Sequence, residues 1–365
     1  MTQRSRRAAS VLIALGAVVA LGACSSSGTS STPSSTAGTT ATAAPAGAGG
    51  SVDNKPFTIG FVEITEAAPV VLQTVAELKR GAALLGWNVK VVNANGDPSR
   101  MASGVSAMVN QGVDALITMA IPPSAAAVGL EAAKAKGIPA IEVGAPVIDP
   151  NHLYAATYAP DDKKMASMVA AQMVQDLGGK GQLLELKASA QQAIVLRNEA
   201  LQSAIGGTDI KVAASHETDL ANPVQDTVST VSNSLRASTS INAVWAPQDF
   251  EFQPAVDTIV NQHLRNVGVY SIYLDPADFP LLRNHAVPMA IADSPLMDVS
   301  WYALDSLVNK LVLNKSDWVV DPSIHPLPYV VVTPKNVPST DSWPYDDFAP
   351  FFKARWQAAG ITLKG

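Results

Sequence analysis

Short apolar runs alternate with longer periodic segments through most of this chain. Residues 57–62 (FTIGFV) are a short run bounded by polar positions, which predicts a buried strand. In the segment that follows, residues 69–86, apolar side chains recur every three or four positions, which predicts a helix with one apolar face. The apolar residues of that face are Val71, Val75, Leu78, Ala82 and Leu85.

The same alternation repeats along the first half of the chain. Further strands are expected at 88–92, 114–119 and 138–143, with helices at 98–111 and 123–136 between them. The strands begin at 57, 88, 114 and 138, that is, 31, 26 and 24 residues apart. A helical crossover between parallel strands needs about this much chain.

A second series of elements begins after Pro150. Strands are expected at 153–156, 182–186, 210–214, 243–246 and 267–273, and helices at 161–177, 190–205, 223–237 and 250–263. The fold class is therefore α/β, with two doubly wound parallel-sheet lobes. A third part, with strands at 289–292 and 329–333 and a helix at 295–313, is too small to be a domain and should return across both lobes.

The first 24 residues read as a secretory signal. Arg4, Arg6 and Arg7 precede an apolar run, 11–20, that is too short to cross a bilayer. Residues 21–24 (LGAC) resemble the lipobox of bacterial lipoproteins, and Cys24 is the only cysteine in the chain. We expect a signal peptide at 1–23, a lipid on Cys24, and a flexible Ser/Thr/Ala/Gly tether over 24–54 that leaves the protein on the extracytoplasmic face of the membrane.

Charge and motif content exclude several function classes. The net charge is −6, and Lys and Arg are scattered, so nucleic acid is not expected as a partner, and the membrane only through the lipid. The five histidines lack metal-site spacing, and G-x-S-x-G, P-loop and S-x-x-K motifs are missing from the sequence. We therefore predict no catalytic residue, no metal and no cofactor. The pair Asp161 and Asp162 suits an acid/base dyad or a helix N-cap, and the cap is preferred.

Several segments resemble the type 1 periplasmic binding proteins, notably the ribose-like sugar-binding subfamily of bacterial ABC importers. They are residues 59–62 (IGFV), 79–87 (KRGAALLGW), 111–117 (QGVDALI), 136–140 (KGIPA) and 241–249 (INAVWAPQD). The resemblance implies two lobes joined by three crossovers, here near 155–159, 293–295 and 321–324. It also implies an N-terminal lobe of 55–157 plus 294–322, and a C-terminal lobe and tail of 158–293 plus 323–365.

The resemblance further implies a small polar ligand between the lobes, hinge closure around it, and docking on an ABC permease. In open α/β sheets, ligands bind beyond the carboxyl ends of the strands. The candidate ligand residues are therefore those that follow strands or lie beside them: Glu63, Glu66, Gly144, Arg197, Asp219, Gln248, Asp249, Tyr273, Asp275 and Asp293. Structural roles are open alternatives for three of these residues. Glu63 and Glu66 could cap or solvate the start of the first helix, and Asp293 could hydrogen-bond the backbone of the hinge.

The chain departs from the sugar-binding pattern at two places. Gly144 and Ala145 stand where the family usually has Asp-Arg, and residues 67–70 (AAPV) where it has stacking aromatics. A sugar or polyol is the leading ligand, and the acidic candidates would also suit an amine-bearing solute. Alternative functions are a ligand-sensing subunit for a membrane kinase, a lipid-anchored hydrolase, or a structural surface protein. Trp245 and Trp301 are expected in the core, and the aromatic tail after residue 340 has no assigned role.

Overall fold

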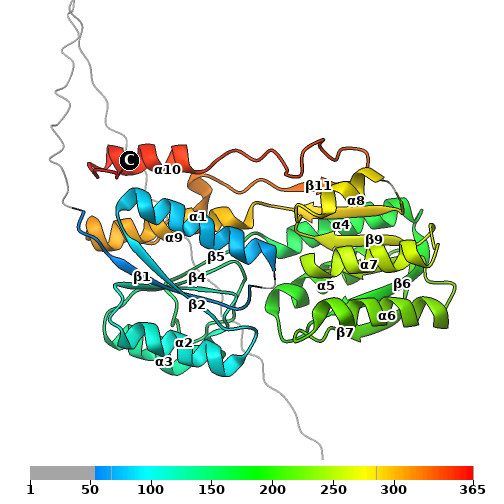
Figure 1. Cartoon of the computed structure of the whole chain (residues 1–365), viewed down its shortest axis with the longest axis horizontal. Coiled ribbons are helices and arrows are strands. Elements are labelled where there is room, and N and C mark those ends of the chain that lie inside the picture. Colours follow the sequence, from blue (N-terminus) through cyan, green and yellow to red (C-terminus); the bar gives the residue numbers. More distant parts are fainter. Residues whose placement is uncertain (1–53, 67, 285, 365) are drawn as a thin grey trace, which may run out of the picture. The chain divides into compact units, whose positions relative to one another are not determined.

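The computed structural model describes residues 54–66, 68–284 and 286–364, all within one compact unit spanning residues 49–365. The predicted signal peptide, Cys24 and nearly all of the tether lie outside the described residues. The N-terminal lobe holds a parallel sheet with the order β2-β1-β3-β4-β5. Its strands are β1 (Thr58–Glu63), β2 (Asn88–Asn93), β3 (Ala115–Met119), β4 (Ala140–Val143) and β5 (Ala156–Tyr158) (Figure 1).

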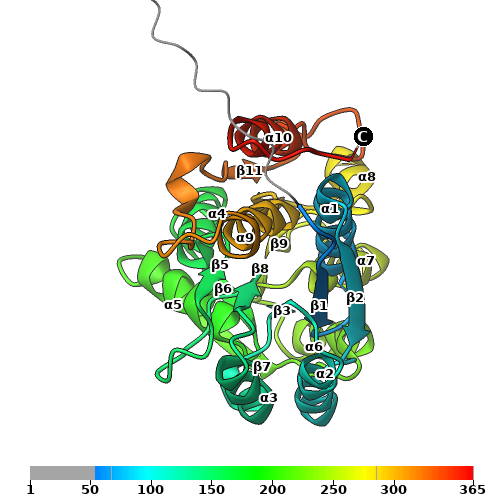
Figure 2. The same ribbon diagram turned by 90° about the vertical axis from the view of Figure 1, so that its left-hand side faces the viewer.

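Helices cover both faces of this sheet. One face carries α1 (Pro69–Leu85) together with α9 (Val299–Leu307), and the other carries α2 (Pro98–Asn110) and α3 (Pro123–Ala135) (Figure 2). Because both faces are covered, every residue of β3 and β4 is buried. This explains why these strands are mostly apolar, with only Thr118 and Glu142 as polar residues.

The C-terminal lobe repeats the arrangement. Its sheet has the order β11-β10-β9-β8-β6-β7 and is parallel except for β11, which runs antiparallel to β10. The strands are β6 (Lys180–Lys187), β7 (Asp209–Glu217), β8 (Ala243–Ala246), β9 (Gly268–Ile272), β10 (Met289–Asp293) and β11 (Val330–Val332). The helices are α4 (Asp162–Asp176), α5 (Gln192–Ile205), α6 (Pro223–Ala237), α7 (Asp249–Asn261) and α8 (Asp278–Asn284). The predicted fold class, two doubly wound parallel-sheet lobes, is confirmed.

The chain crosses between the lobes near residues 159–161, 294–295 and 313–329. After the second crossover a short 3₁₀ turn, Leu296–Asp298, leads into α9, which continues as a π-helical turn, Val308–Val312. α9 packs against α1, where the side chain of Leu304 occupies the space that a Cβ atom on Gly81 would need. Trp301 on α9 and Trp245 on β8 are fully buried, as the apolar spacing predicts.

The structure differs from the sequence prediction at three elements. The strand expected at 153–156 lies at Ala156–Tyr158, where it pairs with β4. Helices α8 and α10 (Ala349–Ala358) were not predicted. The tail was assigned to the C-terminal lobe, yet α10 packs on α9 of the N-terminal lobe because Phe352 and Trp356 stack around Trp301. Among the described residues, no helix combines the length and apolarity needed to cross a membrane.

Candidate functional site

Four buried aspartates gather at the carboxyl ends of three neighbouring strands of the C-terminal lobe. Asp249 begins the helix after β8, Asp275 and Asp278 follow β9, and Asp293 is the last residue of β10. Since β8, β9 and β10 are adjacent in the sheet, residues far apart in the sequence meet at one edge. We call Asp249, Asp275, Asp278 and Asp293 the carboxylate cluster.

Several buried polar atoms in and beside the cluster have no hydrogen-bond partner among the described residues. They are Asp249 Oδ2, Asp275 Oδ1, Tyr273 Oη, Asp162 Oδ2 and Ser294 Oγ. An unsatisfied buried polar group costs on the order of 1–3 kcal/mol, and such groups are few in folded proteins. Their concentration at this edge indicates a place where a ligand supplies the missing hydrogen bonds.

Burial and mutual repulsion hold these carboxyl groups close to neutrality. Desolvation, together with the charges of Asp249 and Asp293, raises the pKa of Asp275 to about 7. Desolvation raises the pKa of Asp293 to about 6, although hydrogen bonds from Tyr345 and the Leu274 and Ser294 backbone amides lower it. Burial also raises the pKa of Asp278. These carboxyl groups accept hydrogen bonds when ionised. A ligand that donates hydrogen bonds to the ionised form lowers their pKa and favours loss of the proton.

One ion pair borders the cluster. Arg197 on α5 donates to Asp162 Oδ1 from Nε at 2.7 Å and lies 2.5 Å away through Nη2, and it also donates to the Pro247 carbonyl at 2.6 Å. Its guanidinium lies 5.0 Å from the centre of the Tyr273 ring. Burial lowers the pKa of Arg197, and the Asp162 carboxylate together with the charges of Tyr273 and Asp249 raises it above its usual value. Arg197 is therefore a fixed cation at the cluster's border.

Gln248 is held in place by Glu251. The Gln248 backbone N–H donates to Glu251 Oε2 and its Nε2 to Oε1, both at 3.2 Å, while the Thr218 hydroxyl donates to Oε1 at 2.7 Å. Desolvation raises the pKa of Glu251 to about 7, against the hydrogen bonds that lower it. Glu251 thus fixes the side-chain amide of Gln248 at the start of α7.

Left-handed backbone occurs directly after strands in both lobes. Tyr273, directly after β9, has φ of 70°, and Ala120, directly after β3, has φ of 57°. Non-glycine residues in this region are uncommon and concentrate at functional sites. Gly144, after β4, has φ of 86°, and a Cβ there would lie 3.0 Å from Met119 Cε. The left-handed conformation and the contact with Met119 therefore explain why glycine occupies position 144, a predicted ligand residue.

The N-terminal lobe contributes a separate acidic position. Glu63 ends β1 and is fully buried, and neither carboxylate oxygen has a partner among the described residues. Desolvation and then Glu66 raise the pKa of Glu63 to about 7. Glu66 itself is exposed. Glu142, which the sequence analysis did not consider, accepts hydrogen bonds from Thr118 and from Ala120 N, the latter at 2.5 Å, and so supports the loop after β3.

The structure brings together some predicted ligand residues and separates others. Arg197, Gln248, Asp249, Tyr273, Asp275 and Asp293 lie in or beside the carboxylate cluster. Asp219 is exposed, and its Oδ1 accepts a hydrogen bond from the Ala221 amide in a local turn. β7 is an edge strand, and although Thr218 at its end reaches Glu251, the hydrogen bonds of Asp219 itself are with residues of its own loop and α6.

Four residues of this region escaped the sequence analysis as site residues. Asp161 does cap α4, by accepting from Lys164 N at 2.9 Å, but Asp162 is buried against Arg197. Asp278 and Ser294 follow strands and could have been found by the same rule as Asp275. Tyr345, whose hydroxyl donates to Asp293 Oδ2 at 2.8 Å, lies 52 residues away in the sequence and carries no local signal.

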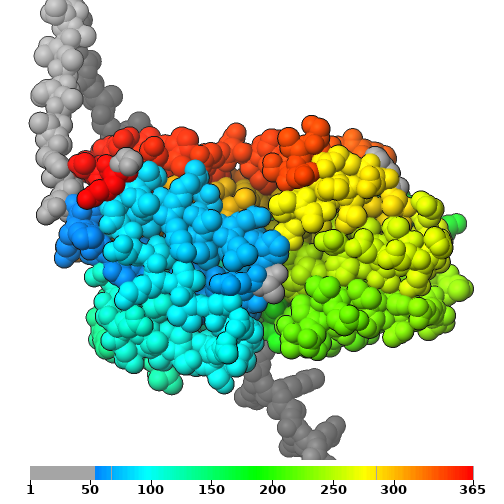
Figure 3. Space-filling model, viewed as in Figure 1, coloured from blue at the N-terminus to red at the C-terminus, as the bar shows by residue number. Residues whose placement is uncertain are grey.

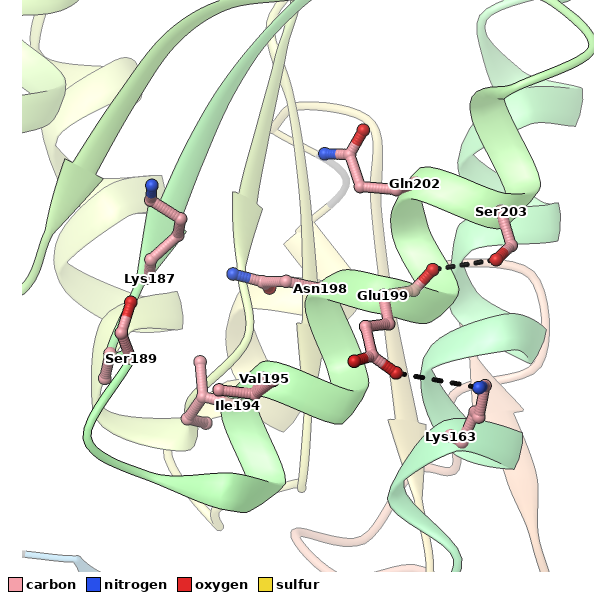
Figure 4. A pocket seen from close by; sticks show the side chains of 10 residues that line it. Lys163, Lys187, Ser189, Ile194, Val195, Asn198, Glu199, Gln202 and Ser203 are labelled. Carbon is pink, nitrogen blue, oxygen red and sulfur yellow. Dashed lines mark hydrogen bonds and ion pairs between the residues drawn. The ribbon is translucent and has the colours of Figure 1, made fainter. Parts of the chain in front are cut away.

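A surface hollow of about 510 Å³ lies elsewhere on this lobe, between α4, β6 and α5 (Figure 4). Its charged side chains are exposed, and Lys163 and Glu199 form an ion pair at 3.7 Å. Its amide and hydroxyl groups are already engaged within the protein, Asn198 by Trp245 and Leu186 and Gln202 by Glu185. Because it contains none of the cluster residues, the hollow is not the candidate site.

The described residues also hold no grouping of His, Cys, Asp and Glu arranged to bind a metal ion.

Two relatives resemble parts of the chain in sequence. The xylitol-binding protein of Mycolicibacterium smegmatis is 36% identical over 103 residues, 28% of this chain and 28% of that protein. The ribose import binding protein of Bacillus subtilis is 29% identical over 137 residues, 38% of this chain and 44% of that protein. The chain thus matches less than half the length of these relatives.

One solved structure illustrates the likeness in fold. A solute-binding protein of an ABC transporter from Mycobacterium smegmatis, with bound glycerol, superimposes with a TM-score of 0.70 at 20% identity, covering 80% of this chain and all of that one. The model of the periplasmic binding protein domain matches residues 59–315, which contain both sheets apart from β11 and every residue of the carboxylate cluster. The chain therefore belongs to the periplasmic binding protein domain family.

Proposed function

We propose that this chain is the extracytoplasmic substrate-binding lipoprotein of an ABC importer, and that it captures a sugar or polyol at the carboxylate cluster. The observation that carries the proposal is the set of buried, unpartnered oxygens on Asp249, Asp275 and Tyr273. Hydroxyl groups of a polyol donate hydrogen bonds to such carboxylates and accept one from the tyrosine. The names of the relatives, which bind xylitol and ribose, agree with this ligand class.

Calorimetry and thermal unfolding with xylitol, ribose and glycerol test this function. A ligand that binds only the folded state, at about 100 times its Kd, stabilises the protein by about 2.7 kcal/mol. We expect at least one of the three to raise the melting temperature in this way. If none of these, nor a wider panel of pentoses, hexoses and polyols, binds, the proposal is wrong.

A second ligand class is an amine-bearing solute such as an amino sugar. It is favoured by the surplus of carboxylates, because no ion pair of the described residues includes a cluster aspartate, and Arg197, which interacts with Asp249, is already paired with Asp162. A matched pair of ligands, glucosamine and glucose, distinguishes the classes. Tighter binding of glucosamine that weakens as salt is added supports the amine, since screening affects only the charged ligand.

Attachment to the membrane rests on Cys24. We infer that the residues before Cys24 are removed and that the protein is held on the outer face by a lipid on this thiol, where it delivers ligand to a permease. Replacing Cys24 by serine should move the protein from the membrane fraction to the soluble fraction of the cell. Retention of the Cys24→Ser protein in the membrane fraction would contradict the lipid anchor.

A further inference from the structure

The C-terminal segment between β11 and α10, residues 333–348, extends over both lobes. Figure 1 shows it leaving β11 on the C-terminal lobe and reaching α10, which lies over α1 and α9, and Figure 3 shows its orange and red surface across both lobes. We call residues 333–348 the strap. It is a covalent link between the lobes in addition to the three crossovers of the fold.

The first half of the strap is fixed to the C-terminal lobe. Arg283, on α8, donates from Nη1 to the carbonyls of Pro338 and Thr340, both at 3.1 Å, and from Nη2 to the carboxylate of Asp341. Val337 and Trp343 pack against that lobe's apolar core. The anchor therefore combines a guanidinium bound at three points with buried apolar surface.

The second half is fixed to the N-terminal lobe. Arg80, on α1, binds Asp347 in a bidentate pair, with Nη1 at 3.1 Å from Oδ2 and Nη2 at 2.5 Å from Oδ1. Behind it, α10 is held by Asp305, which accepts from Arg355 Nε at 2.7 Å and Trp356 Nε1 at 2.8 Å. Bidentate arginine pairs fix geometry as well as contributing energy.

Tyr345 lies between these two anchors. Its hydroxyl donates to Oδ2 of Asp293, while Oδ1 of Asp293 accepts from Leu274 N at 3.1 Å. Asp293 belongs to the carboxylate cluster and immediately precedes the second crossover. The strap therefore contacts the cluster through one hydrogen bond, at the place where the chain passes from one lobe to the other.

We propose that Tyr345 is a positioning residue of the ligand site, and that the strap couples the orientation of Asp293 to the spacing of the two lobes. The positioning role rests on the proposed function, because it requires a ligand. The coupling rests only on the contacts of the strap. If the lobes separate, Asp347 moves with Arg80 while Asp341 stays with Arg283, so the strap must shift and Tyr345 with it. Closure then places Tyr345 on Asp293 and fixes the carboxylate for ligand.

A double-mutant cycle on Tyr345 and Asp293 tests the positioning role. In Tyr345→Phe only the hydroxyl is lost, and we expect the Kd for xylitol or ribose, whichever the wild type binds, to rise about tenfold, since a hydrogen bond to a charged group is removed. In the Asp293→Ala background the same substitution should change Kd less than twofold, because alanine offers the Tyr345 hydroxyl no hydrogen-bond partner. The control Tyr270→Phe removes a hydroxyl that donates to Asp176 at the end of α4, and should leave Kd unchanged.

The outcomes separate the two proposals. If the wild type binds a polyol and Tyr345→Phe binds it equally well, the positioning role is wrong while the proposed function stands. An equal loss of affinity for Tyr345→Phe in both backgrounds would also overturn it, since the residue would then act through general stability. If the wild type binds none of the probes, the proposed function fails and the coupling is judged by the next measurement.

X-ray scattering of the ligand-free protein tests the coupling without any ligand. Asp347→Asn removes the charge and the Oδ2 acceptor for Arg80 Nη1, which weakens the contact with Arg80, and it keeps Oδ1 for the Ala349 amide that Asp347 caps at 2.9 Å. We expect a slightly larger radius of gyration than in the wild type, because one contact between the strap and the N-terminal lobe is weakened while α10 stays bound to α9 through Asp305. The neighbouring exposed Asp346→Asn is the matched control and should scatter like the wild type. Identical curves for Asp347→Asn and the wild type would overturn the coupling.

Discussion

Single side chains in this protein differ in importance according to burial rather than charge. Asp162 and Lys163 are adjacent in the sequence and each forms an ion pair, yet the Asp162 side chain is 0% exposed and that of Lys163 is 58% exposed. A buried pair cannot lose one partner without stranding the other charge, whereas an exposed pair is replaced by water.

Substitution of these two neighbours should therefore give very different losses of stability. Asp162→Ala leaves Arg197 buried without its carboxylate, and we expect the free energy of unfolding to fall by about 3–5 kcal/mol. Lys163→Ala, the matched control, should cost less than about 1 kcal/mol. Urea unfolding followed by circular dichroism measures both. Equal losses would mean that the Arg197 pair is not a buried structural contact.

The raised pKa values of the cluster predict how stability varies with pH. A carboxyl group whose pKa is higher in the folded state than in the unfolded state binds more protons when folded, so its contribution to stability is lost as pH rises through the folded value. With folded values of about 7 for Asp275 and about 6 for Asp293, the ligand-free protein should be less stable at pH 8 than at pH 5. Thermal unfolding across this range measures the slope.

Replacement of one acid identifies the source of that slope. Asp275→Asn cannot ionise, so it should stabilise the ligand-free protein more at pH 8 than at pH 5. The exposed Asp209→Asn serves as a control, since Asp209 lies at the start of β7, the opposite end of the sheet from the cluster. A slope that Asp275→Asn leaves intact would have to arise from other acids.

At the scale of elements, the sequence predicts best the strands and helices that have a periodic apolar pattern. The parallel strands and their crossover helices follow from apolar spacing, and Asp249, Asp275 and Asp293 were predicted because each follows or ends a strand. Asp219 follows a strand as well, but strand order within the sheet is a tertiary property and places β7 at the edge. Helix α10 escaped because its apolar face is defined by Trp301 on α9, far away in the sequence.

Contacts between distant residues account for the remaining site residues that were missed. Asp162 acquires its role from Arg197, 35 residues later, and Tyr345 from Asp293, 52 residues earlier. Neither pair has a characteristic spacing, because the chain between the partners forms whole elements of variable length. The acidic strand ends can be recognised in the sequence, and their partners only in the folded chain.

The turn after β4 gives a prediction at this scale. Gly144→Ala forces an alanine into left-handed backbone, which costs about 1–2 kcal/mol, and also pushes its Cβ against Met119. Gly112→Ala is a matched control with φ of 71° and open space around the added atom. Both variants should lose free energy of unfolding through the left-handed backbone. In urea unfolding, Gly144→Ala should lose more than Gly112→Ala because of the Met119 contact. Equal losses of stability would show that the contact with Met119 adds no cost at residue 144.

At the scale of the whole described unit, we expect the two lobes to close on a ligand, as part of the proposed function. The N-terminal lobe offers Glu63, buried and unpartnered, while the C-terminal lobe offers the carboxylate cluster. Hinge motion of this kind couples binding to a change in shape that a membrane partner can recognise. The strap and the three crossovers are the parts of the chain that must bend or shift when this happens.

Scattering with and without ligand measures this closure. We expect the radius of gyration to fall when the sugar or polyol identified by calorimetry is added at saturating concentration, because the lobes approach each other. Addition of a sugar that does not bind provides the control for solvent contrast. A radius unchanged by a ligand that calorimetry shows to be bound would contradict hinge closure and leave a rigid binding site.

The central claim, that the carboxylate cluster is the ligand site, is tested most directly by calorimetric titration of three proteins with the same polyol. The wild type should bind it, Asp275→Asn should bind at least tenfold more weakly because an unpartnered acceptor is replaced by an amide, and Asp209→Asn should bind like the wild type. Binding by Asp275→Asn as tight as that of the wild type would place the ligand elsewhere and contradict the account.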